Sequence, residues 1–232
     1  MTAHRRTPPR GLLEGLGLSP GDLALDVGCG DGAGTRWLAR SGAWFFGLDL
    51  RPGRMASAAL RWRHNVAYGA GDASSLPLRD GSFDAVACCH VLHHLREREA
   101  ALMEMARVLR RGGRLGIVDA VVPSTSGVSR FLHEAHDMRD GEGEVRFSSA
   151  RELPEMIRRS GFQLVRMEAR LIEHDLAEWA RRGHGAHPPV EAIRKHFSGA
   201  SPALRGALRM QPATGEPQSF STIETTLIAS RA

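Results

Sequence analysis

Short apolar runs alternate with amphipathic stretches through the first half of the chain. The runs that we interpret as strands lie at 23–28, 43–50, 66–72, 83–89 and 113–121. Stretches with helical periodicity lie before and between them, at 10–21, 34–42, 53–63 and 97–113. Strands that alternate with helices in this way predict a parallel sheet built from strand–helix units. We expect the leading stretch, 10–21, to cover one edge of that sheet.

The regular alternation ends after the fifth predicted strand. Residues 123–148 combine a short helical piece with a Gly- and acid-rich loop, and residues 173–217 contain three expected helices separated by Gly/Pro-rich sequence. Between these two segments we predict a helix at 149–162 and a sixth strand at 162–171. A seventh strand follows at 219–230, where the period-two alternation is typical of a strand with unlike faces.

The length of 232 residues suits one well-cored domain. We therefore expect a single α/β domain over 1–232, with its core at about 20–122 and the segments 123–148 and 173–217 inserted as small helical caps. No run approaches 18 uncharged apolar residues, so we expect no membrane partner and a cytoplasmic location. The three cysteines form no CxxC pair, which is typical of a reducing compartment.

The formal charge of +5 would ordinarily suggest a nucleic-acid partner. However, Lys195 is the only lysine, and the arginines are spread along the chain. The densest basic stretches, at 61–63, 107–111 and 181–184, contain few aromatic residues on which bases could stack. We interpret the basic residues as solvated helix faces and expect no nucleic acid as partner.

The stretch "LDVGCGDGAG" at 25–34 places a glycine-rich turn directly after the first predicted strand. In open α/β sheets this turn lies closest to the ligand, and glycines there allow positive φ angles or close approach of the backbone. The turn fits the pattern GxGxG, but with Ala33 it also fits the dinucleotide fingerprint GxGxxA. Asp49, at the end of the second predicted strand, suits the ribose of either cofactor class.

Three further features distinguish these cofactor classes. Asp26 lies just before the glycines, where a carboxylate would repel a pyrophosphate but would suit a ligand with an ammonium group. Asp72 follows the third predicted strand and could accept a hydrogen bond from an adenine amino group. The sequence around the fourth predicted strand contains no recognisable nicotinamide-side constellation.

Four motifs, "LALDVGCGDGAGTRWLA", "GLDL", "GDASSLPLRDGSFDAVACCHVLHHL" and "EMARVLRRGGRLGIVD", follow one another in this chain. They resemble the successive motifs of class I S-adenosylmethionine-dependent methyltransferases, in the branch of the ubiquinone/menaquinone-biosynthesis enzymes, over about residues 20–120. The resemblance implies a Rossmann-like, seven-stranded, mainly parallel sheet with an antiparallel last strand and helices on both faces. It also implies S-adenosylmethionine as the cofactor and S-adenosylhomocysteine as its product.

The resemblance further implies which residues contact this cofactor. Asp26 would lie near the methionine ammonium group, and Cys89 and His90 would border the sulfonium. The other implied contacts are the methionine and ribose portion for Gly28, Cys29, Gly30 and Gly32, the ribose for Asp49 with Leu50, and the adenine for Asp72 and Ala73, with Leu76 a weaker candidate.

Two adjacent histidines are candidates for catalysis. Methyl transfer requires mainly an aligned and dry arrangement of the reactants, so no universal catalytic residue is expected. A hydroxyl or acidic-carbon acceptor would benefit from a base, and histidine suits this task near neutral pH. His93 and His94 follow the fourth predicted strand, where they could act as the base, position the substrate, or cap the following helix.

The cap segments contain a second set of polar and aromatic candidates. His133 and His136 share one face of an expected helix and could point into the site, although we expect them to be exposed to solvent. The nearby Asp137 would suggest a metal site with these histidines, but no third ligand has suitable spacing, so we expect no metal. The aromatic residues of the caps could line an apolar pocket or pack the caps: Phe131, Phe147, Trp179 and Phe197.

Two absences narrow the acceptor. The fourth predicted strand ends in "CCHV" and not in the Asn/Asp-Pro-Pro-aromatic sequence common in methylation of base amino groups, and no Pro-Cys nucleophile is present. We therefore expect methyl transfer to a small molecule, with O- or C-methylation slightly favoured. The alternatives are a non-catalytic nucleoside-binding module and, less favoured, an NAD(P)-dependent oxidoreductase.

Overall fold

The structure is a computed structural model that describes residues 8–53, 55, 63–123, 126–140, 145–181 and 189–232. Most of the helix predicted at 53–63 lies outside these residues. The strands are β1 Leu23–Val27, β2 Trp44–Asp49, β3 Val66–Ala70, β4 Phe83–Cys89, β5 Leu109–Val122, β6 Ser148–Ser149, β7 Phe162–Asp175 and β8 Ser219–Arg231. The helices are α1 Arg10–Leu16, α2 Ala33–Leu38, α4 Arg98–Val108, α5 Ser126–Asp140, α6 Glu152–Arg159, α7 Leu176–Arg181, α8 Val190–Ser198 and α9 Pro202–Ala207, with 3-10 turns η1 Ala39–Ser41 and η2 Leu92–His94.

The strands form one sheet in the order β3-β2-β1-β4-β5-β8-β7. Strands β1 to β5 are parallel, whereas β8 is antiparallel to both of its neighbours, β5 and β7. This confirms the mainly parallel sheet with an antiparallel last strand. The strand order reverses between β1 and β4, where a ligand site is expected beyond the carboxyl ends of the strands.

The described residues contain eight strands, and the predicted number of seven was therefore wrong. The additional strand, β6, has two residues, and it pairs with the end of β5 through Val121 and Ser148. A strand of two residues carries no readable alternation, which explains why the pattern did not indicate it.

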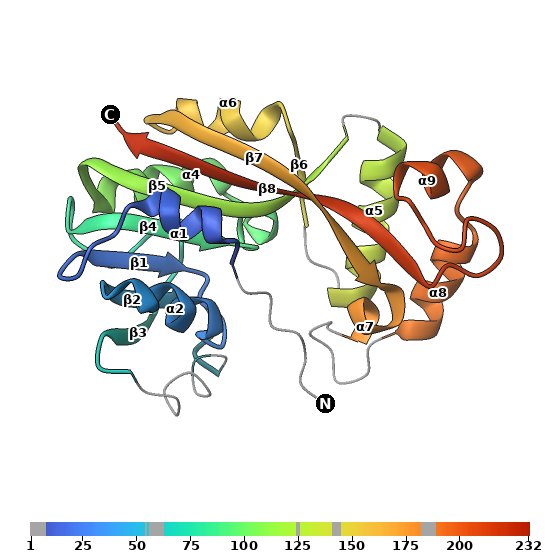
Figure 1. Ribbon diagram of the computed structural model, residues 1–232, viewed down its shortest axis with the longest axis horizontal. Helices are drawn as coiled ribbons and strands as arrows, with labels where there is room; N and C mark the ends of the chain where they lie inside the picture. The colour runs from blue at the N-terminus through green and yellow to red at the C-terminus, as the bar shows by residue number, and fades with distance from the viewer. Residues whose placement is uncertain (1–7, 54, 56–62, 124–125, 141–144, 182–188) are drawn as a thin grey trace.

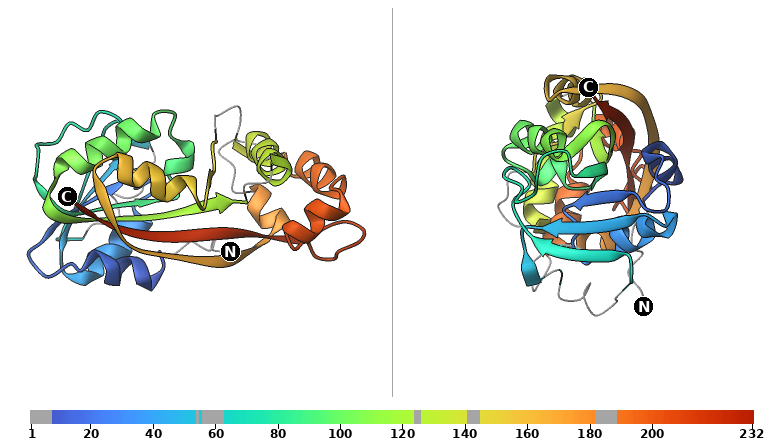
Figure 2. Two further views of the ribbon diagram at one scale, coloured as in Figure 1. Left: turned by 90° about the horizontal axis from the view of Figure 1, so that it is seen from above. Right: turned by 90° about the vertical axis from the view of Figure 1, so that its left-hand side faces the viewer.

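Helices cover both faces of the sheet, as predicted (Figure 2). On one face α4 and α6 pack over a core that includes Leu102, Met105 and Ile157. On the other face lie α1 and α2. A Cβ atom on Gly116 of β5 would lie 2.4 Å from Leu12 of α1. Helix α1 therefore lies on the face of the sheet, and the prediction that it covers an edge was wrong.

Helix α4 ends at Val108, whereas we expected the helix to continue to residue 113. From Leu109 the chain pairs with Phe83 of β4, and Arg110 forms an ion pair of 2.9 Å with Asp84. Pairing with β4 thus extends β5 backward into a stretch with helical periodicity, an example of tertiary contacts overriding local preference.

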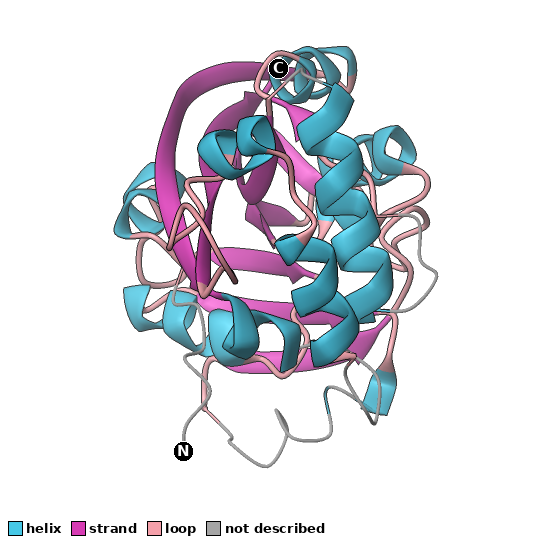
Figure 3. Cartoon of the chain, turned by 90° about the vertical axis from the view of Figure 1, so that its right-hand side faces the viewer, coloured by secondary structure: helices cyan, strands magenta, loops and turns pink. Residues whose placement is uncertain are grey.

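Strands β7 and β8 extend as a long ribbon beyond the other strands and carry a second group of helices (Figure 1). Helices α5, α7, α8 and α9 gather at this end, which Figure 3 shows from the front. They enclose a separate hydrophobic cluster, in which Trp179, Phe197 and Phe220 form mutual ring contacts. The segments 123–148 and 173–217 therefore both contribute to one second core.

Candidate active site

The turn after β1 needs glycines for two different reasons. Gly28, Gly30 and Gly32 have φ angles of 73°, 55° and 70°, which strain any residue with a side chain. A Cβ atom on Gly28 would also lie 2.2 Å from Val91, whereas one on Gly30 would have no neighbour within 4 Å. Gly28 thus permits close packing against Val91, and Gly30 leaves open space.

Asp49 connects the end of β2 to this turn. Its side chain is buried, and its two carboxylate oxygens accept the N–H groups of Gly30 and Arg51, both at 2.9 Å. Asp49, the residue predicted to bind the ribose, therefore lies directly beside the glycine turn. A carboxylate has about four lone-pair sites, so these two bonds leave acceptor capacity for a ligand.

Asp26 is buried at the end of β1 beside a cavity of about 200 Å³. The hydroxyl of Thr35 donates a hydrogen bond of 2.6 Å to one of its oxygens. Burial raises the pKa of Asp26 from 3.8 to about 7, the Thr35 hydrogen bond opposes this shift, and the Asp49 charge adds to it. A cationic ligand group would stabilise the ionised form that burial disfavours.

The cavity brings together five of the predicted cofactor residues. Its lining includes Asp26, Gly28, Cys29, Cys89 and His90. Burial raises the pKa values of the Cys29 and Cys89 thiols, so both are protonated and unreactive at neutral pH. These cysteines line the cavity as small apolar groups.

The remaining predicted cofactor residues lie outside this lining. Asp72 is exposed, and one of its oxygens accepts the N–H and hydroxyl groups of Ser74 at 2.8 and 2.7 Å. Ala73 and Leu76 are buried in the main core, whereas Leu50 is 67% exposed. Gly30 and Gly32 belong to the turn but do not border the cavity.

His93 forms a buried pair with Asp119 of β5. The backbone N–H group of His93 donates a hydrogen bond of 3.1 Å to Asp119 Oδ2, and the ring Nδ1 of His93 is hydrogen-bonded to Asp119 Oδ1. Burial alone would raise the pKa of Asp119, but the interactions with His93 and the charge of His90 outweigh it and lower the pKa. The ionised carboxylate orients the ring through Nδ1, and the His93 side chain does not cap a helix.

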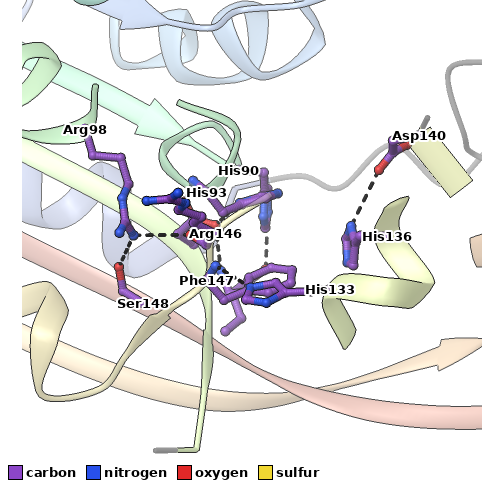
Figure 4. A network of polar contacts seen from close by, with 12 residues as sticks. His90, His93, Arg98, His133, His136, Asp140, Arg146, Phe147 and Ser148 are labelled. Atoms are coloured by element: carbon purple, nitrogen blue, oxygen red, sulfur yellow. Dashed lines mark hydrogen bonds and ion pairs between the residues drawn. The ribbon is translucent and has the colours of Figure 1, made fainter. Parts of the chain in front are cut away.

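Residues of the cap reach the same region through Phe147 (Figure 4). The Phe147 ring stacks on His93 at 5.2 Å and on His133 at 5.4 Å, and His136 approaches its edge at 4.9 Å. His133 also accepts the Phe147 N–H group at 3.2 Å. The expectation that His133 and His136 are exposed was therefore wrong, because Phe147 covers both rings.

Burial lowers the pKa values of His94 and His136 to about 3. Both rings are therefore neutral at pH 7 and can donate or accept hydrogen bonds without adding charge. Phe131, Trp179 and Phe197 are buried in the second core, which favours the packing interpretation for these three aromatic residues.

Sequence reasoning missed Asp119 and Glu224, two acids on interior strands. Asp119 lies in the apolar stretch "GIVDAVV", and Glu224 interrupts "STIETTLI" on β8. Each is nearly fully buried and paired with a histidine, His93 and His90 respectively. A charged residue within an apolar strand was the available signal, because such residues are rarely buried unless paired.

Within the residues that the structure describes, no cluster of three or more His, Cys, Asp or Glu side chains could hold a metal ion. Among the same residues, no helix combines the length and apolar character needed to cross a membrane.

Comparison with known proteins matches the part of the chain that contains the glycine turn and strands β1 to β4. The family described as "Methyltransferase domain" matches residues 25–117. Over 115 residues the chain is 43% identical to the demethylmenaquinone methyltransferase of Mycolicibacterium vanbaalenii, which covers 50% of this chain and 49% of that protein. The chain thus spans about half the length of the relatives that it matches by sequence.

Similarity to solved structures extends over nearly the whole chain. The BH2331 protein of Bacillus halodurans C-125 matches with a TM-score of 0.85 and 21% identity, over 95% of this chain and 96% of that one. Geranyl diphosphate methyltransferase, in its complex with SAM, matches with a TM-score of 0.66 and 17% identity, over 95% and 83%. The fold is therefore shared, caps included. Residues 25–117 thus match a methyltransferase domain, within a fold that the chain shares with solved structures over nearly its whole length.

Proposed function

We propose that this protein transfers a methyl group from S-adenosylmethionine to a hydroxyl group or an acidic carbon of a small molecule. The observation that carries the proposal is the buried His93–Asp119 pair. His93 follows His90, which lines the cavity, by three residues in the sequence. Asp119 interacts electrostatically with both histidines. N-methylation of an amine that is already unprotonated would need no such base, so the pair favours an acceptor that must lose a proton.

Contacts with the cofactor are proposed for the residues around the glycine turn. Asp26 is suited to the ammonium group because Thr35 occupies only one of its oxygens and burial makes an uncompensated charge costly. Open space at Gly30 and the spare acceptor capacity of Asp49 suit the ribose, with Leu50 beside it. The other proposed contacts are Gly28, Cys29 and Gly32 at the methionine and ribose portion, Asp72 and Ala73 at the adenine, and Cys89 and His90 at the sulfonium.

The bound cofactor supplies an electrophilic methyl group on a positively charged sulfur. Because Asp119 holds the His93 ring through Nδ1, the other ring nitrogen, Nε2, is the atom that takes the acceptor's proton. With the cofactor held by the residues around the glycine turn, His93 would keep the acceptor's proton while the acceptor oxygen or carbon takes up the methyl group and S-adenosylhomocysteine is left as the product. Asp119 then stabilises the imidazolium, in the same way that the buried acid of a catalytic triad does.

Recognition of the acceptor is proposed to involve the caps. His94 and His136 are neutral hydrogen-bonding groups, and Phe147 supplies an apolar surface between core and cap. The relatives' names include a demethylmenaquinone and a geranyl diphosphate acceptor, both small molecules with apolar parts. We further propose that the core at 20–122 and the caps at 123–148 and 173–217 act as one cytoplasmic domain.

Isothermal titration of the purified protein with S-adenosylmethionine, S-adenosylhomocysteine and NAD tests the cofactor assignment. We expect saturable binding of the first two ligands and none of NAD. Asp49→Asn should weaken both nucleosides, whereas the exposed Asp80→Asn should not, with circular dichroism showing that both variants fold. Binding of NAD alone, or normal affinity in Asp49→Asn, would contradict the proposal.

Release of S-adenosylhomocysteine during incubation with a small-molecule extract tests turnover. The wild type should release it, and His93→Gln should release far less while binding the cofactor normally. Equal release by both proteins would contradict the role of His93 as the base.

A further inference from the structure

A second histidine–carboxylate pair lies at the cavity. His90 directly follows β4 with a φ of 56°, and it borders the cavity beside Cys89. His90 Nε2 lies 3.3 Å from Glu224 Oε2, and the side chains are 26% and 3% exposed. Because a residue with a side chain seldom adopts this φ, the conformation of His90 requires support from its surroundings.

Glu224 is held in place from its other side by Arg170 of β7. In the strand register Glu224 faces both Ala120 of β5 and Arg170. Glu224 Oε1 accepts a hydrogen bond of 2.7 Å from Arg170 Nε and lies 2.5 Å from a terminal nitrogen of the same guanidinium group. Burial raises the pKa of Glu224, but His90 and Arg170 outweigh burial and lower it. The carboxylate is therefore ionised at neutral pH.

An ionised carboxylate only accepts hydrogen bonds, so His90 must donate through Nε2–H. When the ring is neutral, Nδ1 is then the unprotonated nitrogen. This tautomer is opposite to that of His93, which is held through Nδ1 by Asp119. The two carboxylates thus fix the two histidines in different protonation patterns.

Among the residues that the structure describes, acidic groups outnumber basic ones around His90. Asp26 and Asp31 line the same cavity, Asp119 acts on His90 from β5, and Glu224 contacts it from β8. Arg170 is the cation paired with Glu224, and its side chain is 49% exposed. Removal of the Glu224 charge would leave the positive charge of Arg170 uncompensated on this side of the cavity.

We propose that Glu224 is a positioning residue that, through His90, makes the site prefer the positively charged methyl donor to its neutral product. This inference rests on the proposed function. Methyl transfer converts a sulfonium into an uncharged thioether, so a negative potential behind His90 stabilises the donor more than the product. Such a difference would hold the donor before the reaction and ease release of the product after it.

The ratio of the dissociation constants for S-adenosylmethionine and S-adenosylhomocysteine tests this proposal. In Glu224→Gln we expect the ratio to rise about tenfold, mainly through weaker binding of the donor. In Arg170→Gln, which removes only the positive partner, the ratio should change in the opposite direction. Glu173→Gln serves as the control and should leave the ratio unchanged, because Glu173 is an acid of β7 that accepts a hydrogen bond from Ser219.

Opposite shifts in the two variants would distinguish an electrostatic role from a structural one, because loss of packing weakens both ligands together. If Glu224→Gln does not fold, the Arg170→Gln ratio still decides, and an unchanged ratio overturns the proposal. Nitrogen-15 spectra should show the Nε2–H tautomer of His90, and an Nδ1–H tautomer would overturn the proposal. A wild-type protein that binds neither ligand would instead refute the proposed function.

Discussion

The carboxyl group of Asp26 connects the stability of the protein with its proposed ligand. Its pKa in the folded protein, about 7, lies above the value of 3.8 expected when it is exposed. The folded state therefore holds this proton more tightly than the unfolded state does. It follows that the contribution of Asp26 makes the ligand-free protein less stable as the pH rises from about 4 to about 7.

Asp26→Asn should therefore stabilise the ligand-free protein at pH 8 by roughly 1–4 kcal/mol, given about 1.4 kcal/mol per pKa unit, and change little at pH 4. The same substitution should abolish cofactor binding. Melting temperatures at the two pH values, together with a cofactor titration, measure both effects. A variant that is less stable than the wild type at pH 8 would contradict the conclusion that burial destabilises the ionised carboxylate of Asp26.

The His93–Asp119 pair gives a second prediction at this scale. Asp119→Asn should lower kcat by roughly 10²- to 10⁴-fold with little change in cofactor affinity, because the ring loses the partner that selects its tautomer. The double variant His93→Gln/Asp119→Asn should be no worse than His93→Gln alone, since the two residues act as a unit. Additive losses in steady-state assays would argue for separate roles.

Some of these residues could be found from the sequence and others could not. The glycines and Asp26 lie within one short motif, so their relation is local. Asp119 is 26 positions from His93, and only the pairing of β4 with β5 brings them together. His133 was placed in solvent because the pattern of one helix does not show that Phe147 covers it.

At the scale of elements, the turn between β1 and α2 offers a matched pair of substitutions. Gly28→Ala and Gly30→Ala introduce the same methyl group at positive φ, but only Gly28 faces Val91. Gly28→Ala should cost at least about 1–3 kcal/mol more in the free energy of unfolding. Gly30→Ala should leave most of the stability and reduce cofactor affinity. Chemical denaturation and titration measure the two quantities, and equal destabilisation would contradict the packing argument.

The pattern predicted long, periodic elements better than short ones or element ends. Strands β1 to β4 lie where their apolar runs predicted them, because both faces of these strands are covered. β6 is too short to produce a pattern, and the beginning of β5 depends on the partner strand. Helix α1 can lie on β5 because Gly116 has no side chain there, and a hydrophobic pattern does not reveal such a close approach.

At the scale of the molecule, the separate hydrophobic cluster under α5, α7, α8 and α9 suggests that the cap can be weakened independently. Phe197 is fully buried in it and contacts Phe220 on β8. Phe197→Ala should loosen the cap at a cost of about 3–5 kcal/mol. S-adenosylmethionine affinity should stay within a few-fold while turnover is lost. Hydrogen exchange should increase in the cap helices alone, and an equal increase in β1 and β4 would indicate a single cooperative core.

The position of β8 between β5 and β7 also has a consequence for biosynthesis. Residues 219–231 supply the only sheet partner that the structure gives β7 within the described residues, and they cover the long edge of β5. On the ribosome, β5 and β7 are therefore made well before the strand that joins them. Until that strand emerges, both carry unpaired backbone groups that can pair with other chains. The nascent protein consequently passes through a stage in which it depends on chaperones or rapid completion to avoid aggregation.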